Sequence, residues 1–412
     1  MGTHDSIRRT VLGGIASAMI AFGVGSVSAQ AQEAIRVGVS LTQSPPGAVI
    51  QGTEVLRGLE IARDLFNEEG GVLDRPIELI VEDSQGIPER GRAAAEKLIT
   101  SDDVVAITGG HQSSVCLAEI GLAARHNVPY INTNCWSDDI RKEGHRQVFN
   151  PNMYNARVAS AMAEVIAGLD VDSVFGLAEN TDWGIGQAEA LGELLEKTGA
   201  DVSYQWELLD REARDFTPVV QGLRGADPDL VALIMLPPAA YVLINQLHEQ
   251  GVVPSEDTWL FEGGGLFSYP DFWNNVREGG AYAIYFDLYH TDMALSDFGT
   301  AVREEYVQRH DGTPSRLVFQ AADSLLLIKE AIENAGGTDP DAMIEWLQQA
   351  EVEGTRGVIT FSDEEGPLFQ QWVDTPFVTF QVTEVDQTLE ETTLISAPDI
   401  GVQVDQLRRP GN

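Results

Sequence analysis

The chain of 412 residues carries 26 Lys and Arg against 64 Asp and Glu, which gives a formal net charge of −38. This acidity excludes an unaided nucleic-acid-binding protein, because binding to the phosphate backbone requires a basic surface. Hydrophobic residues make up 43% of the chain, which is enough for a large core and excludes disorder. Four Lys among many acids are typical of a halophilic protein, and an ordinary acidic protein is the alternative.

Residues 1–31 resemble an export signal peptide. Arg8 and Arg9 precede an apolar run at 11–27 that ends in small residues suited to cleavage. The Arg pair favours the twin-arginine route, and a general secretory signal is the alternative. The run is shorter than the ~20 residues that a membrane-spanning helix needs. We therefore expect an exported, soluble protein in the periplasm.

From Ala34 onward, β-branched runs alternate with amphipathic stretches, as in a parallel sheet covered by helices. In the first part we expect strands and helices in turn, with strands at 35–39, 77–81, 104–108 and 129–132 and helices at 52–69, 88–100 and 113–126. This order predicts a doubly wound domain whose loops at the strand carboxyl ends are available for a ligand.

A second run of the same kind follows residue 151. It predicts helices at 155–169, 186–198, 216–225 and 239–250 and strands at 173–178, 202–208, 230–236 and 258–261. The last part predicts helices at 296–310, 317–334 and 341–350 and strands at 357–361 and 377–382. Late helices without partner strands indicate that the chain returns to complete the first domain.

The chain has two cysteines, Cys116 and Cys135. In an exported protein they predict one disulfide, which would close a loop of about 20 residues and stabilise the fold by roughly 3 kcal/mol. Two free buried thiols are the alternative. No CxxC or HExxH spacing is present, so we expect no bound metal and no cofactor.

Several local strings, in a fixed order, resemble one known family. They include IRVGVSLT at 35–42, NEEGG at 67–71, ITGGHQSS at 107–114, NVPYINT at 127–133 and GVITFSDEEG at 357–366. Their order and spacing resemble the leucine-binding (type I) family of periplasmic substrate-binding proteins of ABC transporters. The resemblance extends over residues 35–382.

The resemblance implies two α/β lobes that are joined by three crossovers and close on a ligand like a hinged clamp. Lobe one would comprise residues 34–152 and 289–367, and lobe two residues 153–288 and 368–400, with a tail at 401–412. It also implies that the partners are a small-molecule ligand and the permease subunits of an ABC importer, and that the protein is a monomer.

The resemblance places a ligand carboxylate on the loop that begins the third helix, at His111, Gln112, Ser113 and Ser114. Free N–H groups and the positive end of a helix favour an anion there. Either serine can cap the helix as well as donate its hydroxyl, and a cap alone is the simpler alternative. His111 can equally be a loop residue without a ligand contact.

The next loop, with Asn134 and Trp136, matches the family's second carboxylate-binding segment. A bridge between Cys116 and Cys135 would lock these two loops together. From the opposite lobe, Trp183 would cover the ligand through apolar or cation–π contact. Packing of Trp183 inside lobe two is the alternative.

Three further positions complete the predicted site. Leu236 stands where the family often has an aromatic residue or a hydroxyl donor, and Gln51 stands where an aromatic residue is common. The acid that pairs with the ammonium group of an amino acid aligns with Gly264. Glu262 lies two residues earlier, and residues two apart on a strand point to the same side.

An enzyme is not expected, because neither a GxSxG motif nor a phosphate-binding loop is present. We expect a periplasmic receptor that captures an amino acid or a related compound between two lobes and delivers it to an ABC importer. A receptor for urea, an amide or a small aromatic carboxylate, and a ligand sensor for a membrane signalling partner, are the alternatives.

Overall fold

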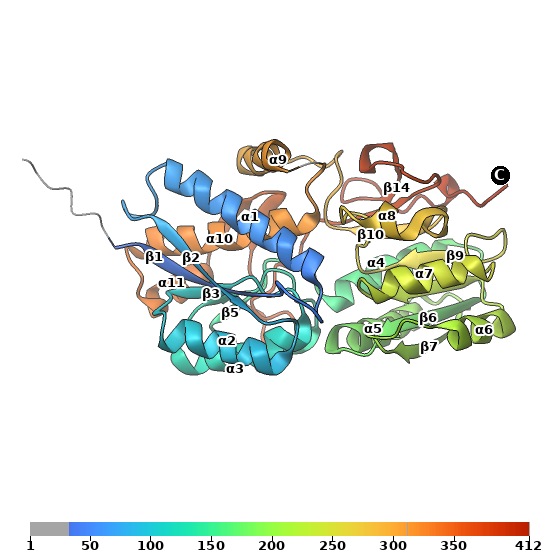
Figure 1. Cartoon of the computed structure of the whole chain (residues 1–412), viewed down its shortest axis with the longest axis horizontal. Helices are drawn as coiled ribbons and strands as arrows, with labels where there is room; N and C mark the ends of the chain where they lie inside the picture. The colour runs from blue at the N-terminus through green and yellow to red at the C-terminus, as the bar shows by residue number, and fades with distance from the viewer. Residues whose placement is uncertain (1–32, 311, 412) are drawn as a thin grey trace, which may run out of the picture. The chain divides into compact units, whose positions relative to one another are not determined.

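The computed structural model describes residues 33–310 and 312–411. The export signal predicted at 1–31 lies outside the described residues. Within them the strands form two large sheets and one small hairpin, with helices on the faces of both sheets (Figure 1). The predicted α/β class, with two sheet-based lobes, is confirmed.

The first sheet is parallel, and its strands lie in the order β2-β1-β3-β4-β5. Its strands are β1 (Ile35–Leu41), β2 (Ile77–Asp83), β3 (Ala106–Thr108), β4 (Tyr130–Ile131) and β5 (Val148–Phe149). Val37 and Val39 pack on one face, while an added Cβ on Gly38 would meet Leu98 and Val104 on the other. β1, which lies between β2 and β3, is thus buried on both faces from Val37 to Leu41.

Helices from both ends of the chain cover this sheet. They are α1 (Val49–Glu68), α2 (Pro88–Thr100), α3 (Ser113–His126), α9 (Asp297–Arg309), α10 (Arg316–Ala335) and α11 (Pro340–Leu347). α2 packs with α3, and α1 packs with α10 on the opposite side (Figure 1). The hairpin of β11 (Glu351–Gly354) and β12 (Gly357–Thr360) follows α11.

The second sheet has the strand order β14-β13-β10-β9-β8-β6-β7. Its strands are β6 (Ser173–Glu179), β7 (Ser203–Leu209), β8 (Leu230–Ile234), β9 (Trp259–Glu262), β10 (Ile284–Asp287), β13 (Val378–Gln381) and β14 (Thr393–Ser396). The strands from β6 to β10 pair in parallel, and β13 pairs antiparallel with both β10 and β14. The returning chain therefore adds an antiparallel edge to a parallel sheet.

Alternating side chains of β8 show how this sheet is buried. Leu230, Ala232 and Ile234 pack in one apolar cluster, and Val231 and Leu233 pack in another. The helices that supply these clusters are α4 (Asn155–Gly168), α5 (Asp182–Thr198), α6 (Thr217–Ala226), α7 (Ala239–Glu249) and α8 (Phe272–Val276). A five-residue apolar run with no polar alternation is the expected pattern for such a strand.

The helix predicted at 186–198 begins four residues earlier, at Asp182. Thr181 caps it, because its Oγ1 accepts the N–H of Gly184 at 3.2 Å. Gly184 packs against the carbonyl of Glu179, so the glycine permits a tight turn from strand to helix and does not break the helix. This correction places Trp183 in the first turn of α5.

Other elements were not predicted. These are β5, α8, β10, β11 and β14. Conversely, the strand predicted at 104–108 begins only at Ala106, and the helix predicted at 52–69 begins at Val49. The chain passes between the sheets after β5, after β10 and after β12, in line with three crossovers. The lobe boundaries at residues 152, 288 and 367 stay predictions.

No helix within residues 33–310 and 312–411 has the length and apolarity needed to span a membrane.

Substitution of Gly58 tests the contact between α1 and α10. An added Cβ would collide with the backbone of Val318 and lie 2.9 Å from the Cβ of Ala321. We expect Gly58→Ala to lower the free energy of unfolding by about 1–3 kcal/mol, because overpacking outweighs the gain in helix propensity. Gly121→Ala in α3 is the matched control, since its Cβ would meet no atom within 4 Å. Urea unfolding of both variants is the measurement, and equal stabilities would contradict the packing argument.

Candidate functional site

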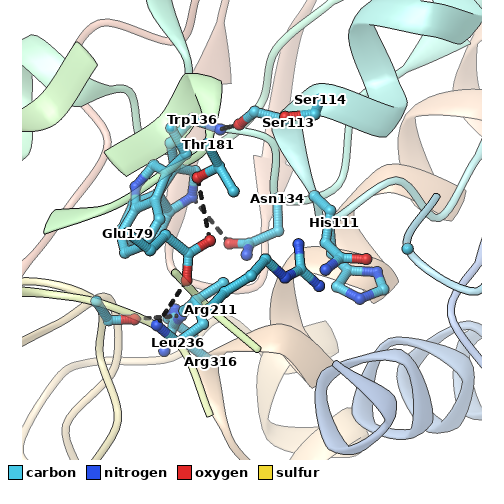
Figure 2. Close-up of a pocket in the computed structure, with 14 residues that line it drawn as sticks. His111, Ser113, Ser114, Asn134, Trp136, Glu179, Thr181, Arg211, Leu236 and Arg316 are labelled. Atoms are coloured by element: carbon cyan, nitrogen blue, oxygen red, sulfur yellow. Dashed lines mark hydrogen bonds between the residues drawn. The ribbon is translucent and has the colours of Figure 1, made fainter. Parts of the chain in front are cut away.

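A cavity lies where loops of the two sheets meet, with about 450 Å³ of space between its atoms, part of it open to solvent. The loops follow the carboxyl ends of strands, where open α/β sheets bind ligands. Figure 2 shows side chains from both lobes converging on this space. The lining residues are Gly86, His111, Gln112, Ser113, Ser114, Asn134, Trp136, Glu179, Thr181, Trp183, Arg211, Leu236, Gly264 and Arg316.

Ser113 begins α3 and lines the cavity. Its Oγ accepts the backbone N–H groups of Trp136 and Ser137, each at 3.1 Å, and the bond to Trp136 is drawn in Figure 2. A hydroxyl oxygen that accepts two hydrogen bonds keeps its proton for a third partner. Gln112 makes no side-chain cap at this helix, so the positive end of α3 adds to the donor. Ser113 and the start of α3 form an edge of the cavity that is suited to bind a negatively charged ligand oxygen.

Ser114 joins the two lobes at the rim of the cavity. Its Oγ donates to the Oδ2 of Asp182 at 2.5 Å, and Asp182 is the first residue of α5. Thr181, which caps α5, lines the cavity beside it. The starts of α3 and α5 are therefore tied to each other across the site.

A disulfide between Cys116 and Cys135 holds the loop after β4 against α3, with 6.6 Å between the two Cα atoms. Asn132 fixes the same loop, since its side chain accepts the N–H of Cys135 and donates to the carbonyl of Cys135, each at 2.8 Å. The next residues reach the cavity, where Trp136 donates its Nε1–H to the Oδ1 of Asn134 at 2.9 Å. The bridge therefore positions the loop that carries both side chains.

Glu119 lies buried in α3, three residues after the bridged Cys116. Its carboxyl group accepts hydrogen bonds from the hydroxyls of Ser40 at 2.5 Å and Tyr130 at 2.7 Å. Burial raises the pKa of the Glu119 carboxyl to about 7, although both hydroxyls act in the opposite direction. This group links β1, α3 and β4 beneath the cavity.

The wall from the second lobe is built at the end of β6. Glu179 accepts the hydroxyl of Thr181 and the backbone N–H of Leu236, both at 3.0 Å (Figure 2). Burial raises the pKa of Glu179, and the charge of Arg211 acts against that rise. The strand end thus places an acid and a guanidinium group on the same wall.

Two tryptophans meet across the cavity. The rings of Trp136 and Trp183 lie edge to face, with their centroids 6.4 Å apart. The backbone of Trp183 is held by Asn155, whose side chain donates to the Trp183 carbonyl at 3.0 Å. The Nε1–H of Trp183 is buried and has no acceptor among the described residues. It is a donor that a ligand oxygen can use.

Arg316, the first residue of α10, reaches from the first lobe to the second and is fully buried. Its guanidinium donates to the carbonyls of Gly265 at 2.7 Å and Gly264 at 2.8 Å and to the Tyr269 hydroxyl at 2.9 Å. Asp287 lies 3.6 Å away as an ionic partner. Burial works against the charge on Arg316, but Tyr269 and Asp287 outweigh it and raise the pKa of Arg316.

His111 is buried, and its ring lies near Arg211 (Figure 2). Burial lowers the pKa of His111 to about 4, and the charge of Arg211 adds to this effect. The imidazole is therefore neutral at neutral pH, with one nitrogen as donor and the other as acceptor.

The cavity brings together most of the residues expected from the sequence. These are His111, Gln112, Ser113, Ser114, Asn134, Trp136, Trp183 and Leu236. Leu236 contributes its backbone N–H to Glu179 in addition to its side chain. Their roles toward a ligand stay predictions.

Two expected residues do not line the cavity. Glu262 is fully buried, and its carboxyl accepts the N–H groups of Gly264 and Leu266, so it holds the loop after β9. Burial raises the pKa of Glu262 to about 8. Gln51 lies inside α1, because that helix starts at Val49, and it is buried and is not among the residues that line the cavity.

Other lining residues were missed in the sequence. They are Gly86, Glu179, Thr181, Arg211, Gly264 and Arg316. Glu179 and Thr181 flank the Trp183 segment, so the predicted end of the strand at 178 was a signal for both. Arg316 directly precedes a predicted helix, but no local pattern distinguishes it from the other arginines. Among the described residues, no group of three or more His, Cys, Asp or Glu is placed to hold a metal ion.

Comparison with known proteins agrees with this geometry. A family model described as "Periplasmic binding protein" matches residues 34–381. The chain belongs to the leucine-binding (type I) family of periplasmic binding proteins. Members of this family bind solutes and are not enzymes.

Individual members of the family are distant in sequence. The Leu/Ile/Val-binding protein homolog 7 of Brucella abortus (strain 2308) is 24% identical, with 88% of this chain and 95% of that protein covered. LivJ of Streptococcus pneumoniae in complex with isoleucine has a TM-score of 0.76 at 18% identity, covering 89% of this chain and 100% of that one. An R. palustris solute binding protein in complex with benzoate has a TM-score of 0.75 at 16% identity, covering 88% and 96%.

The buried Glu119 predicts a dependence of stability on pH. Its pKa in the folded protein, about 7, exceeds the ordinary value of 4.5, so the folded state keeps a proton that the unfolded chain loses. The Glu119 contribution to stability therefore falls by up to about 3 kcal/mol as pH rises from about 4.5 to about 7. In urea unfolding across this range, Glu119→Gln should remove that part of the slope. Glu193→Gln, an exposed control on α5, should keep it. Equal slopes in the wild type and Glu119→Gln would contradict the assignment.

Proposed function

We propose that this binding protein captures a small organic carboxylate in the cavity between its lobes and delivers it to an ABC importer. The observation that carries the proposal is Ser113, whose Oγ accepts two backbone N–H groups and therefore turns its own proton to a ligand. The uncapped start of α3 supports an anion at the same place.

The tryptophans support an organic ligand with an apolar or flat body. Trp136 and Trp183 provide ring surfaces from opposite lobes, and both are buried. Isoleucine in the S. pneumoniae protein and benzoate in the R. palustris protein both combine a carboxylate with an apolar body. Amino acids and aromatic carboxylates are therefore the two classes to test first.

The contacts between the lobes support capture by closure. Ser114 with Asp182, and Arg316 with Gly264 and Gly265, bridge the lobes beside the cavity. Such bonds can form only when the two lobes approach, so a ligand that also bridges the lobes would favour the closed form. The closed form would then dock on the permease.

The setting of this receptor is also part of the proposal. We place it in the periplasm as a monomer, exported through a signal of the twin-arginine type at 1–31, and its acid-rich composition supports a habitat of high salt. Native mass spectrometry of the purified protein would show a small molecule that co-purifies with it. An organic acid is the expected finding, and a neutral amide such as urea would contradict the proposed ligand class.

Ser113→Ala tests the carboxylate-binding edge. A hydrogen bond to a charged group contributes about 1.5–3 kcal/mol, so we expect a loss of affinity of roughly tenfold to a hundredfold. Calorimetry would use the tightest binder among leucine, isoleucine, benzoate and 4-hydroxybenzoate. Ser160→Ala is the control, because that hydroxyl donates to Glu164 within α4. Unchanged affinity in Ser113→Ala would remove this residue from the site.

Deletion of the gene tests delivery to an importer. Uptake of the radiolabelled ligand should fall to about background in the deletion strain and return when the wild-type chain is supplied. The Ser113→Ala chain should restore uptake only at higher ligand concentration. Full uptake without the protein would contradict the importer role and favour the alternative, a sensor for a membrane signalling partner.

A further inference from the structure

The polar groups that line the cavity leave more hydrogen-bond donors than hydrogen-bond acceptors free for a ligand. A ligand must supply acceptors where the protein has free donors, and donors where the protein has free acceptors. Since the lining residues and their hydrogen bonds are known, the two kinds of group can be compared directly.

Most side-chain acceptors of the lining already have donors, but the neutral ring of His111 keeps one nitrogen as an acceptor without a partner among the described residues. Both oxygens of Glu179 accept bonds, the Oδ1 of Asn134 accepts from Trp136, and the Oε1 of Gln112 accepts from Thr42 at 2.8 Å. The Oγ of Ser113 accepts two N–H groups. A ligand therefore finds few acceptors that are not already engaged.

The carbonyl of Gly264 already accepts a hydrogen bond from the guanidinium of Arg316, which carries the same positive charge as an ammonium group. Arg316 donates to this carbonyl and to that of Gly265, and its guanidinium stacks on the ring of Trp136 at 5.2 Å. One face of Trp136 is thus occupied by a cation of the protein itself. This face of Trp136 and the carbonyl oxygens of Gly264 and Gly265 are therefore engaged by Arg316 before a ligand ammonium group could use them.

Several donors, in contrast, have no acceptor among the described residues. The Nε1–H of Trp183 and the Nε–H of Arg316 are both buried without a partner, and both groups are donors only. Arg211 lines the cavity beside them, and the hydroxyl proton of Ser113 remains free. Glu179 is the one carboxylate among the lining residues, and Arg316 has Asp287 as an ionic partner outside the lining. The free N–H groups of Trp183 and Arg316, together with Arg211, are therefore the features of the lining that favour an anionic oxygen.

We infer that the ligand is an organic acid without an ammonium group, such as a 2-oxo acid, which carries a carboxylate and at least one further oxygen acceptor. This inference rests on the proposed function, because it assumes that the cavity binds a carboxylate. It assigns Arg316 and Arg211 as the residues that select against amino acids: Arg316 occupies the acceptors that an ammonium requires, and Arg211 offers a charged donor.

The direct test uses pairs of compounds that differ only at the ammonium group. Calorimetry with the wild-type protein would compare leucine with 4-methyl-2-oxopentanoate and phenylalanine with phenylpyruvate, and then the remaining amino acids with their 2-oxo acids. We expect the 2-oxo acid to bind at least tenfold more tightly in every pair that shows binding. Tighter or equal binding of the amino acid would overturn the inference and leave the proposed function standing. If no carboxylate in the panel binds, both fail.

Variants show whether the arginines cause the selectivity. Arg211→Gln should weaken binding of the preferred 2-oxo acid at least tenfold, because it removes a charged donor from the lining, and a melting curve would show that the variant is folded. Arg224→Gln on α6 makes the same change in net charge away from the cavity and should leave affinity unchanged. Unchanged affinity in Arg211→Gln would overturn its assigned role.

Three further variants test the roles of the other lining residues. Trp183→Phe keeps an aromatic ring but removes the Nε1–H, so affinity for the 2-oxo acid should fall severalfold. Glu179→Gln removes the one carboxylate of the lining, which repels an anion, so 2-oxo acid affinity should rise. If the wild type binds an amino acid and Glu179→Gln abolishes that binding, Glu179 recognises an ammonium and the inference is wrong. Arg316→Gln, measured only if it folds, should lower 2-oxo acid affinity at least tenfold.

Discussion

The buried guanidinium of Arg316 is the interaction on which the site depends. A charge without water requires partners on all sides, and Arg316 finds them only in the opposite lobe, at the carbonyls of Gly264 and Gly265 and at Asp287. The same group supports the ring of Trp136. One side chain at the start of α10 thereby fixes the loop after β9, one aromatic wall and the approach of the lobes.

The sheet topology makes this arrangement possible. Parallel strands direct their carboxyl ends to one edge, so the loops after β3, β4, β6 and β8 all reach the cavity from their own sheets. The first lobe is completed by α10, which comes from late in the chain and packs on α1. Arg316 can therefore stand beside residues that precede it by about two hundred positions, such as Ser113.

The sequence was sufficient where local patterns determine structure. The alternation of β-branched runs with amphipathic stretches located α3 at 113–126, and with it Ser113 and Ser114. The disulfide joins the only two cysteines of the chain, so no choice of pairing arose. Strands such as β10 and β14 were missed because a four-residue strand in an irregular region is too short to show a distinct period.

The site was predictable only in part, because a local pattern marks some of its residues and not others. Asn134 lies in the loop after β4, and Trp183 lies in the first turn of α5, directly after β6. Both follow recognisable strands, so the topology brings them to the cavity. Arg211 and Arg316 depend on contacts between segments far apart in the chain, and a single sequence does not show which of its arginines acquire them. Glu262 failed as a site residue because a short loop turned back and offered its N–H groups to the carboxyl.

The two guanidinium groups of the cavity have a kinetic consequence in a chain of net charge −38. An anion approaching from afar is repelled by the acidic surface, and it meets the favourable charge only at short range. At 1 M salt the Debye length is roughly 3 Å, so the salt screens the long-range repulsion by the acidic surface. It screens the attraction by partly buried guanidinium groups less. Capture of an anionic solute should accelerate as salt is added, whereas steering between opposite charges is slowed by it. Strong brine would then be the medium in which this receptor collects its ligand fastest.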